Sequence, residues 1–126
     1  MMVLARIFVG LAAVLHAYIF YMESLAWTRP AVWQRFSIAD QQTAETTRPM
    51  AYNQGFYNLF LGIGAAIGLV LWWTGHETAG RTLVIFSTAS MVAAATVLIT
   101  SGRQYLRAAL SQGTLPLVGL VLTLLA

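Results

Sequence analysis

The chain has 126 residues, of which 59% are hydrophobic and only 9% charged, whereas a soluble domain carries about a quarter charged residues. Seven arginines and four carboxylates cannot cover a soluble surface of this size, so the composition predicts one domain, residues 1–126, in a membrane. The net charge of +3 comes from scattered arginines, which excludes a nucleic-acid-binding face, and the absence of cysteine excludes disulfides, thiolate metal sites and cysteine nucleophiles.

The first apolar run covers residues 3–27 and is about 37 Å long as a helix, enough to cross a bilayer. His16 lies near its middle, and Glu23 follows two turns later on the same face, about 10 Å away. An ionisable side chain inside a bilayer costs on the order of 3 kcal/mol. We therefore expect both side chains to face the interior of the protein.

Residues 28–50 are polar and form the only sizeable predicted loop. Pro30 and Pro49 bound it, and proline disfavours helix at the residue before it. Within the loop, Trp33 and Phe36 are three residues apart and would share one face of a short helix lying on the membrane surface. An irregular loop with both aromatic rings resting on the lipid head groups is the alternative.

The second predicted helix covers residues 53–73 and opens with the polar sequence NQGFYN. It enters the membrane on the side where the first helix leaves, so its first turns lie near the level of Glu23. The sequence thus predicts a polar pocket within the membrane, formed by His16, Glu23, Asn53, Gln54, Tyr57 and Asn58. Further along, Gly64 and Gly68 form a G-x-x-x-G pattern that permits close approach of another backbone.

Two further runs complete an all-α fold of four transmembrane helices in an up-down bundle. Residues 82–101 are uncharged and rich in small side chains, and His76 and Glu77 in the turn before them are expected to be exposed to solvent. Residues 114–126 make only about 20 Å of helix, short of a full span. Either this helix is short, with Pro116 in its first turn, or it starts earlier, near Tyr105.

The arginines predict the orientation. The first and third loops share one side of the membrane and carry Arg29, Arg35, Arg48, Arg103 and Arg107. The opposite side carries Arg6 and Arg81. The positive-inside rule therefore places the first and third loops in the cytoplasm and both termini outside.

The predicted pocket admits three interpretations. His16 and Glu23 are suited to acid–base catalysis, as in an intramembrane isomerase or epimerase acting on a hydrophobic substrate. The pocket would alternatively bind a small or lipophilic ligand or a partner subunit, such as a second copy of the chain. In the third interpretation its polar groups only hold the helices together. A cavity of at least ~300 Å³ at His16 and Glu23 favours binding or catalysis, and a seal against Asn53 and Asn58 favours the structural role.

We expect no metal and no cofactor. Two histidines at different levels of the membrane do not supply the three or four ligands of a metal site. No phosphate-binding loop or nucleotide-binding fingerprint is present.

Several motifs resemble a small family of bacterial membrane proteins known as domain of unknown function 1304. The resemblance covers nearly the whole chain. It is carried by LHAYIFYMESLAW with His16, Glu23 and Trp27, by Phe36, by NQGFYNLFLG and by QGTLP. It implies a compact four-helix protein of the bacterial inner membrane, similar in architecture to the DoxX-like bundles and without an established activity.

Overall fold

The computed structural model describes residues 1–126, which form helices and no strands. Helix α1 (Met2–Phe20) continues into a π-helical turn (Tyr21–Leu25). The short helix α2 (Pro30–Trp33) continues into a 3-10 turn (Gln34–Phe36). Helices α3 (Gln41–Trp73) and α4 (Glu77–Thr100) follow, and a second 3-10 turn (Arg103–Tyr105) leads into α5 (Leu106–Leu125).

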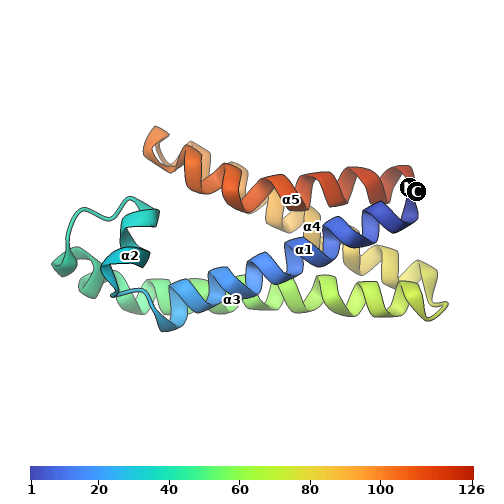
Figure 1. Ribbon diagram of the computed structural model, residues 1–126, viewed down its shortest axis with the longest axis horizontal. Coiled ribbons are helices and arrows are strands. Elements are labelled where there is room, and N and C mark those ends of the chain that lie inside the picture. Colours follow the sequence, from blue (N-terminus) through green and yellow to red (C-terminus); the bar gives the residue numbers. More distant parts are fainter.

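Four helical segments are long and apolar enough to cross a membrane, namely α1 with its π turn, α3, α4, and α5 with its 3-10 turn. Each runs antiparallel to the next, and both termini lie at one end of the bundle (Figure 1). We call this end, with residues 74–76, the terminus end, and the opposite end, with residues 26–40 and 101–105, the loop end. Around the bundle α1 neighbours α3 and α5, and α4 neighbours the same two helices. The predicted four-helix bundle is confirmed.

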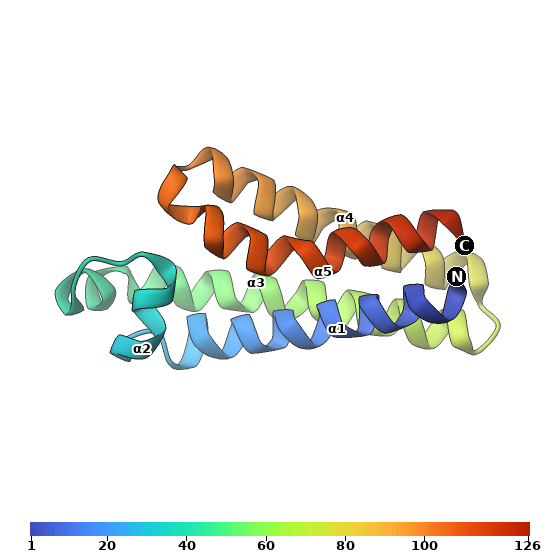
Figure 2. The ribbon, with the colours of Figure 1, turned by 45° about the horizontal axis from the view of Figure 1, so that its top comes forward.

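The α1–α3 pair and the α4–α5 pair pack together at the terminus end and diverge toward the loop end (Figure 2). At the terminus end the buried core draws on α1, α3 and α4, for example through Val9, Trp72 and Val84. At the loop end the buried core consists of residues from α1, its π turn, α2, α3 and the segment between α1 and α2, and none from α4 or α5. Near the loops, the α1–α3 pair and the α4–α5 pair therefore share no buried core.

Glycines let α3 approach two helices at once. A Cβ on Gly68 would lie 2.9 Å from the Gly80 carbonyl and 2.9 Å from the Val84 nitrogen, and a Cβ on Gly64 would lie 2.7 Å from Ser87 Oγ. The close packing predicted for this G-x-x-x-G is therefore confirmed, and its partner is α4. On another face of α3, Gly62 brings the backbone to α1, where a Cβ would lie 3.1 Å from the Ala13 carbonyl oxygen.

The predicted loop over residues 28–50 is too long, because α3 already begins at Gln41 and contains Pro49. Its 33 residues are about 50 Å long, which exceeds the ~30 Å hydrocarbon core of a bilayer. The first turns of α3 therefore project beyond the membrane. Water can reach the Glu45 carbonyl there, which Pro49 leaves without a helical N–H partner.

Capping explains where α3 begins. The Asp40 carboxylate accepts a hydrogen bond of 2.8 Å from the Thr43 backbone nitrogen, a typical helix cap. This bond stabilises the charged carboxylate and lowers the pKa of Asp40 below its ordinary value. Pro30 behaves as predicted, since it occupies the first position of α2 and the residue before it, Arg29, is extended.

The short helix in the first loop exists, but its aromatic side chains do not rest on the membrane surface. Trp33 is 8% exposed, and its Nε1 donates a hydrogen bond of 2.9 Å to Gln41 Oε1. The Phe36 ring packs 5.0 Å from the Trp27 ring. Both rings gain more by joining the loop-end core, where the indole N–H finds a partner, than by lying on head groups.

The last helix follows the second of its two predicted alternatives. A 3-10 turn starts at Arg103 and α5 begins at Leu106, so the last helical span is 23 residues long. The first-turn position of Pro116, which belonged to the first alternative, is not observed, because this buried residue lies in the middle of α5. Proline has no backbone N–H, so it leaves the Gln112 carbonyl without its usual helical donor.

Candidate functional site

The π turn at the end of α1 directs two consecutive polar residues at α3. Asn58 Nδ2 donates a hydrogen bond of 2.6 Å to Glu23 Oε1, and Ser24 Oγ donates one of 2.7 Å to the Tyr52 carbonyl. Glu23, Ser24 and Asn58 are all buried. A π turn is rare and occurs often at functional sites, and here it joins α1 to α3.

This junction is tight. Gly55 lies opposite the π turn, and a Cβ on it would overlap Ser24 Oγ and lie 3.1 Å from Glu23 Cβ. No ligand fits between these backbones. The carboxylate of Glu23 is therefore held against Asn58 rather than facing a space for a substrate.

His16 is also enclosed, with 1% of its surface exposed. Its Nδ1 lies 2.9 Å from the Ala12 carbonyl oxygen, and since a carbonyl only accepts, this nitrogen carries the proton. A Cβ on Gly62 would lie 3.5 Å from His16 Cβ, so the histidine packs on the α3 backbone. The prediction that His16 and Glu23 face the interior is confirmed.

Of the six residues predicted to share one polar pocket, only Glu23 and Asn58 are hydrogen-bonded to each other through their side chains, and three others lie on the surface. Asn53, Gln54 and Tyr57 are exposed on α3, and 63% of the Tyr57 surface is accessible. The cause is the rotation of α3: its face toward α1 follows Gly55 and Asn58, and Tyr57 lies about 100° away from Asn58. Gln54 contributes only its carbonyl, which accepts a 3.3 Å hydrogen bond from Asn58 Nδ2.

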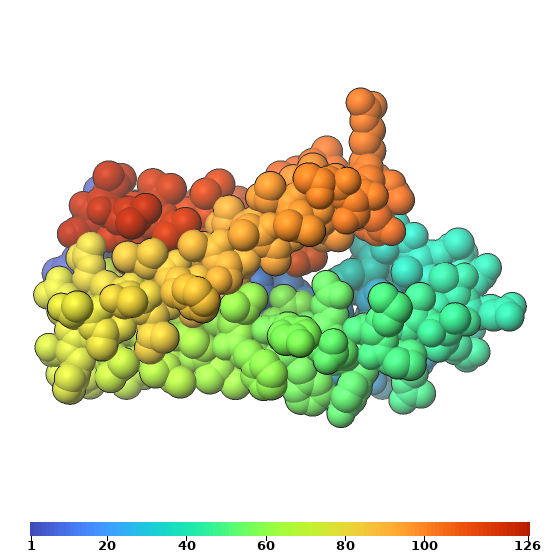
Figure 3. All heavy atoms as spheres, turned by 180° about the vertical axis from the view of Figure 1, so that it is seen from behind, coloured from blue at the N-terminus to red at the C-terminus, as the bar shows by residue number.

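A cavity of about 680 Å³ lies beside a second face of α1, the one that carries Leu15 and Ile19. Its volume is within the size range of small-molecule sites. We call it the loop-end cavity. It occupies the space where the two helix pairs diverge, and the molecule is hollowed there between the first turns of α5, orange in Figure 3, and the cyan first loop. Neither His16 nor Glu23 lines it.

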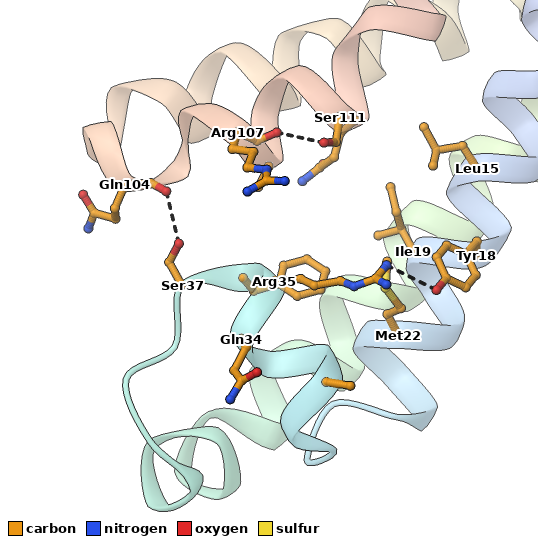
Figure 4. Close-up of a pocket in the computed structure, with 14 residues that line it drawn as sticks. Leu15, Tyr18, Ile19, Met22, Gln34, Arg35, Ser37, Gln104, Arg107 and Ser111 are labelled. Carbon is orange, nitrogen blue, oxygen red and sulfur yellow. Dashed lines mark hydrogen bonds between the residues drawn. The ribbon is translucent and has the colours of Figure 1, made fainter.

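Three parts of the chain form the cavity wall (Figure 4). Helix α1 and its π turn contribute Leu15, Tyr18, Ile19 and Met22. The first loop contributes Ala31, Gln34, Arg35, Phe36 and Ser37. The start of the last span contributes Gln104, Arg107, Ala108, Ser111 and Gln112.

The cavity is positively charged. Arg35 and Arg107 line it, and no aspartate or glutamate does. Arg35 Nη1 donates a long hydrogen bond of 3.5 Å to the Tyr18 hydroxyl, and the Arg107 guanidinium projects into the space between α5 and the first loop (Figure 4). The only salt bridge of the protein joins Arg81 to Glu77 at 3.6 Å, so both cavity arginines lack a carboxylate partner.

One hydrogen bond spans the loop end of the cavity. Ser37 Oγ donates to the Gln104 carbonyl at 3.1 Å, joining the first loop to the third. Ser37 adopts a left-handed backbone conformation with φ of 59°, which is uncommon for a residue other than glycine. This contact is the bridge between the two diverging helix pairs at the loop end.

The sequence analysis did not predict Arg35 and Arg107 as site residues, because it used both arginines only to predict the orientation in the membrane. Both sit on the same predicted side of the membrane, and this was the one available sign that they could meet. The remaining predicted polar residues lie elsewhere: His76 and Glu77 are exposed as predicted. The structure brings no three metal-ligating side chains together.

The fold and the cavity define a small multi-pass membrane protein, with four helices that can span a bilayer and a polar-rimmed cavity at one end. The family model described as "Protein of unknown function (DUF1304)" matches residues 10–124. The chain therefore belongs to this family. No curated protein and no solved structure matches it significantly.

Proposed function

We propose that the protein binds a small lipophilic or amphipathic molecule in the loop-end cavity. The cavity volume of about 680 Å³ carries this proposal, because a packed helical bundle contains few voids larger than a water molecule. Its α1 wall is largely apolar, while polar side chains come from the first loop and the start of α5. An apolar wall with a few polar groups is the usual character of a ligand site.

We propose further that the protein resides in the inner membrane of a bacterial cell, with the first and third loops in the cytoplasm. Five arginines at the loop end against two at the terminus end support this orientation. The cavity then lies at the level of the cytoplasmic head groups.

The acid–base alternative, an isomerase or epimerase using His16 and Glu23, has less support. Glu23 is sealed against Asn58 at 2.6 Å, and neither residue lines the cavity. The geometry favours a structural role for this pair.

Filling the cavity tests the proposal. Ala108 lines the cavity from α5, and we expect Ala108→Trp to occupy part of it. Ala94 is exposed on α4 away from the cavity, so Ala94→Trp is the matched control. Native mass spectrometry of the detergent-purified proteins measures the small molecules that each retains.

We expect the unchanged protein and Ala94→Trp to retain the same bound molecule and Ala108→Trp to lose it. Thermal unfolding of all three establishes that each is folded. Equal retention by the folded Ala108→Trp variant, or association of a second copy in place of a small molecule, contradicts a ligand site in this cavity.

A further inference from the structure

We infer that the loop-end cavity selects an amphipathic oxyanion: a molecule with a phosphate or carboxylate head and an apolar chain. This inference rests on the proposed function and adds the chemical class of the ligand. It follows from the charges of the cavity and from the order in which its residues are arranged.

Arg35 and Arg107 face one cavity from opposite walls (Figure 4), and the lining contains no acidic residue. Both side chains are exposed to solvent, and two like charges at one site repel each other. A bound anion between them removes this repulsion.

The chemistry of guanidinium narrows the class of anion. A guanidinium group presents a planar set of N–H donors that matches the two oxygens of a carboxylate or phosphate. Arg107 makes no side-chain hydrogen bond, and Arg35 makes only the 3.5 Å contact with Tyr18. Most of these donors are therefore available to an oxyanion.

The order of the lining residues along the membrane normal accounts for the apolar chain. The arginines lie at the loop end, on the first loop and the first turn of α5. On α5 the lining stays polar below Arg107, at Ser111 and Gln112, while the α1 wall from Met22 near the loops to Leu15 near the membrane centre is apolar apart from Tyr18. The apolar chain would therefore lie against α1. An amphiphile with its head in the water–lipid interface has the same order of polarity.

A set of matched probes tests this inference on the full protein in neutral-detergent micelles. Dodecyl phosphate has the proposed head and chain, dodecanol has the chain without the charge, and inorganic phosphate has the charge without the chain. Binding is measured by titration with native mass spectrometry, in the unchanged protein and in Arg35→Gln, Arg107→Gln and the double variant. Arg103→Gln is the control, because Arg103 is exposed at the same end but does not line the cavity.

We expect the unchanged protein and Arg103→Gln to bind dodecyl phosphate at least tenfold more tightly than dodecanol. Each cavity variant should weaken dodecyl phosphate binding about tenfold, the size expected from losing one charged hydrogen-bonding partner, while dodecanol binding stays unchanged. Inorganic phosphate binding as tightly as dodecyl phosphate would support a site for a free oxyanion and remove the role of the chain.

Two further outcomes overturn the inference, and they differ in whether the proposed function survives. Equal binding of dodecyl phosphate and dodecanol in all variants refutes the selection of an anion and leaves the ligand cavity standing. If no probe binds, and if Ala108→Trp retains the same molecule as the unchanged protein, the proposed function is refuted as well.

Discussion

Glu23 is the one acidic residue of α1 and its π turn, and its environment shows how the bundle accommodates such a residue. A charged or strongly polar side chain at membrane depth costs on the order of 3 kcal/mol. The 2.6 Å hydrogen bond from Asn58 offsets part of this cost, because an interhelical hydrogen bond in a membrane contributes about 1 kcal/mol. The pair thus stabilises the contact between α1 and α3.

We predict that Asn58→Leu lowers the free energy of unfolding by about 1–3 kcal/mol, because it leaves the buried Glu23 carboxyl without its donor. The double variant Glu23→Leu with Asn58→Leu should be more stable than Asn58→Leu alone, since no buried polar group is then left unpaired. Denaturant unfolding in micelles measures both. A double variant that is the least stable of the set would show that Glu23 has a further partner.

Periodicity and depth sufficed to group Glu23 and Asn58 in one polar cluster, but they placed Asn53 and Gln54, rather than Asn58, at the level of Glu23. They did not suffice for Asn53, Gln54 and Tyr57, because the rotation of α3 about its own axis is set by which small residues meet α1. The sequence contains two such sets: Gly55 and Gly62 contact α1 and its π turn, whereas Gly64 and Gly68 contact α4. Composition alone does not assign them.

At the scale of the helices, the contact between the π turn and Gly55 fixes how α1 and α3 cross. A Cβ on Gly55 would lie 2.9 Å from the Ser24 backbone nitrogen in addition to overlapping Ser24 Oγ. Backbone atoms cannot move aside as a flexible side chain can. The two helices must therefore separate if Gly55 gains a side chain.

We predict that Gly55→Ala lowers the free energy of unfolding by about 1–3 kcal/mol, the usual cost of overpacking. Gly10→Ala is the matched control on α1: its nearest neighbour would be Leu69 Cδ1 at 3.9 Å, and alanine favours a helix over glycine by about 1 kcal/mol. We expect the control to be neutral or slightly more stable. Thermal unfolding in micelles compares the two, and equal stability would contradict the close contact.

Prolines account for the wrong predicted start of α3 and for the two alternatives left open for the start of the last helix. Pro49 and Pro116 both lie inside long helices, although proline usually marks a boundary. In each case only one carbonyl loses its helical partner, while the rest of the helix keeps its packing. Pro30 does mark a boundary, as the sequence predicts, because it occupies the first position of the short helix α2.

At the scale of the whole molecule, the chain contains no cysteine, so single introduced cysteines report the orientation directly. Gln42 and Ser101 are exposed at the loop end, and Thr78 is exposed at the terminus end. We predict that a membrane-impermeant maleimide labels Thr78→Cys in intact spheroplasts, and labels Gln42→Cys and Ser101→Cys only after lysis. The reverse pattern would show that the loops face outward.

Hydrophobic runs sufficed to predict the number of spanning helices, since each needs about 20 apolar residues. The loop-end cavity was beyond such reasoning. It arises from how far two helix pairs diverge and from a first loop that folds inward on Trp33 and Phe36, and both depend on contacts between residues distant in the sequence.

The divergence of the two helix pairs makes the protein unequal with respect to the two leaflets of a bilayer. At the terminus end, Val9, Trp72 and Val84 close the space between the pairs, while at the loop end that space is open. A molecule that reaches the cavity from the lipid must therefore come from the leaflet next to the first and third loops. Vesicles in which only one leaflet contains an anionic lipid would expose this asymmetry.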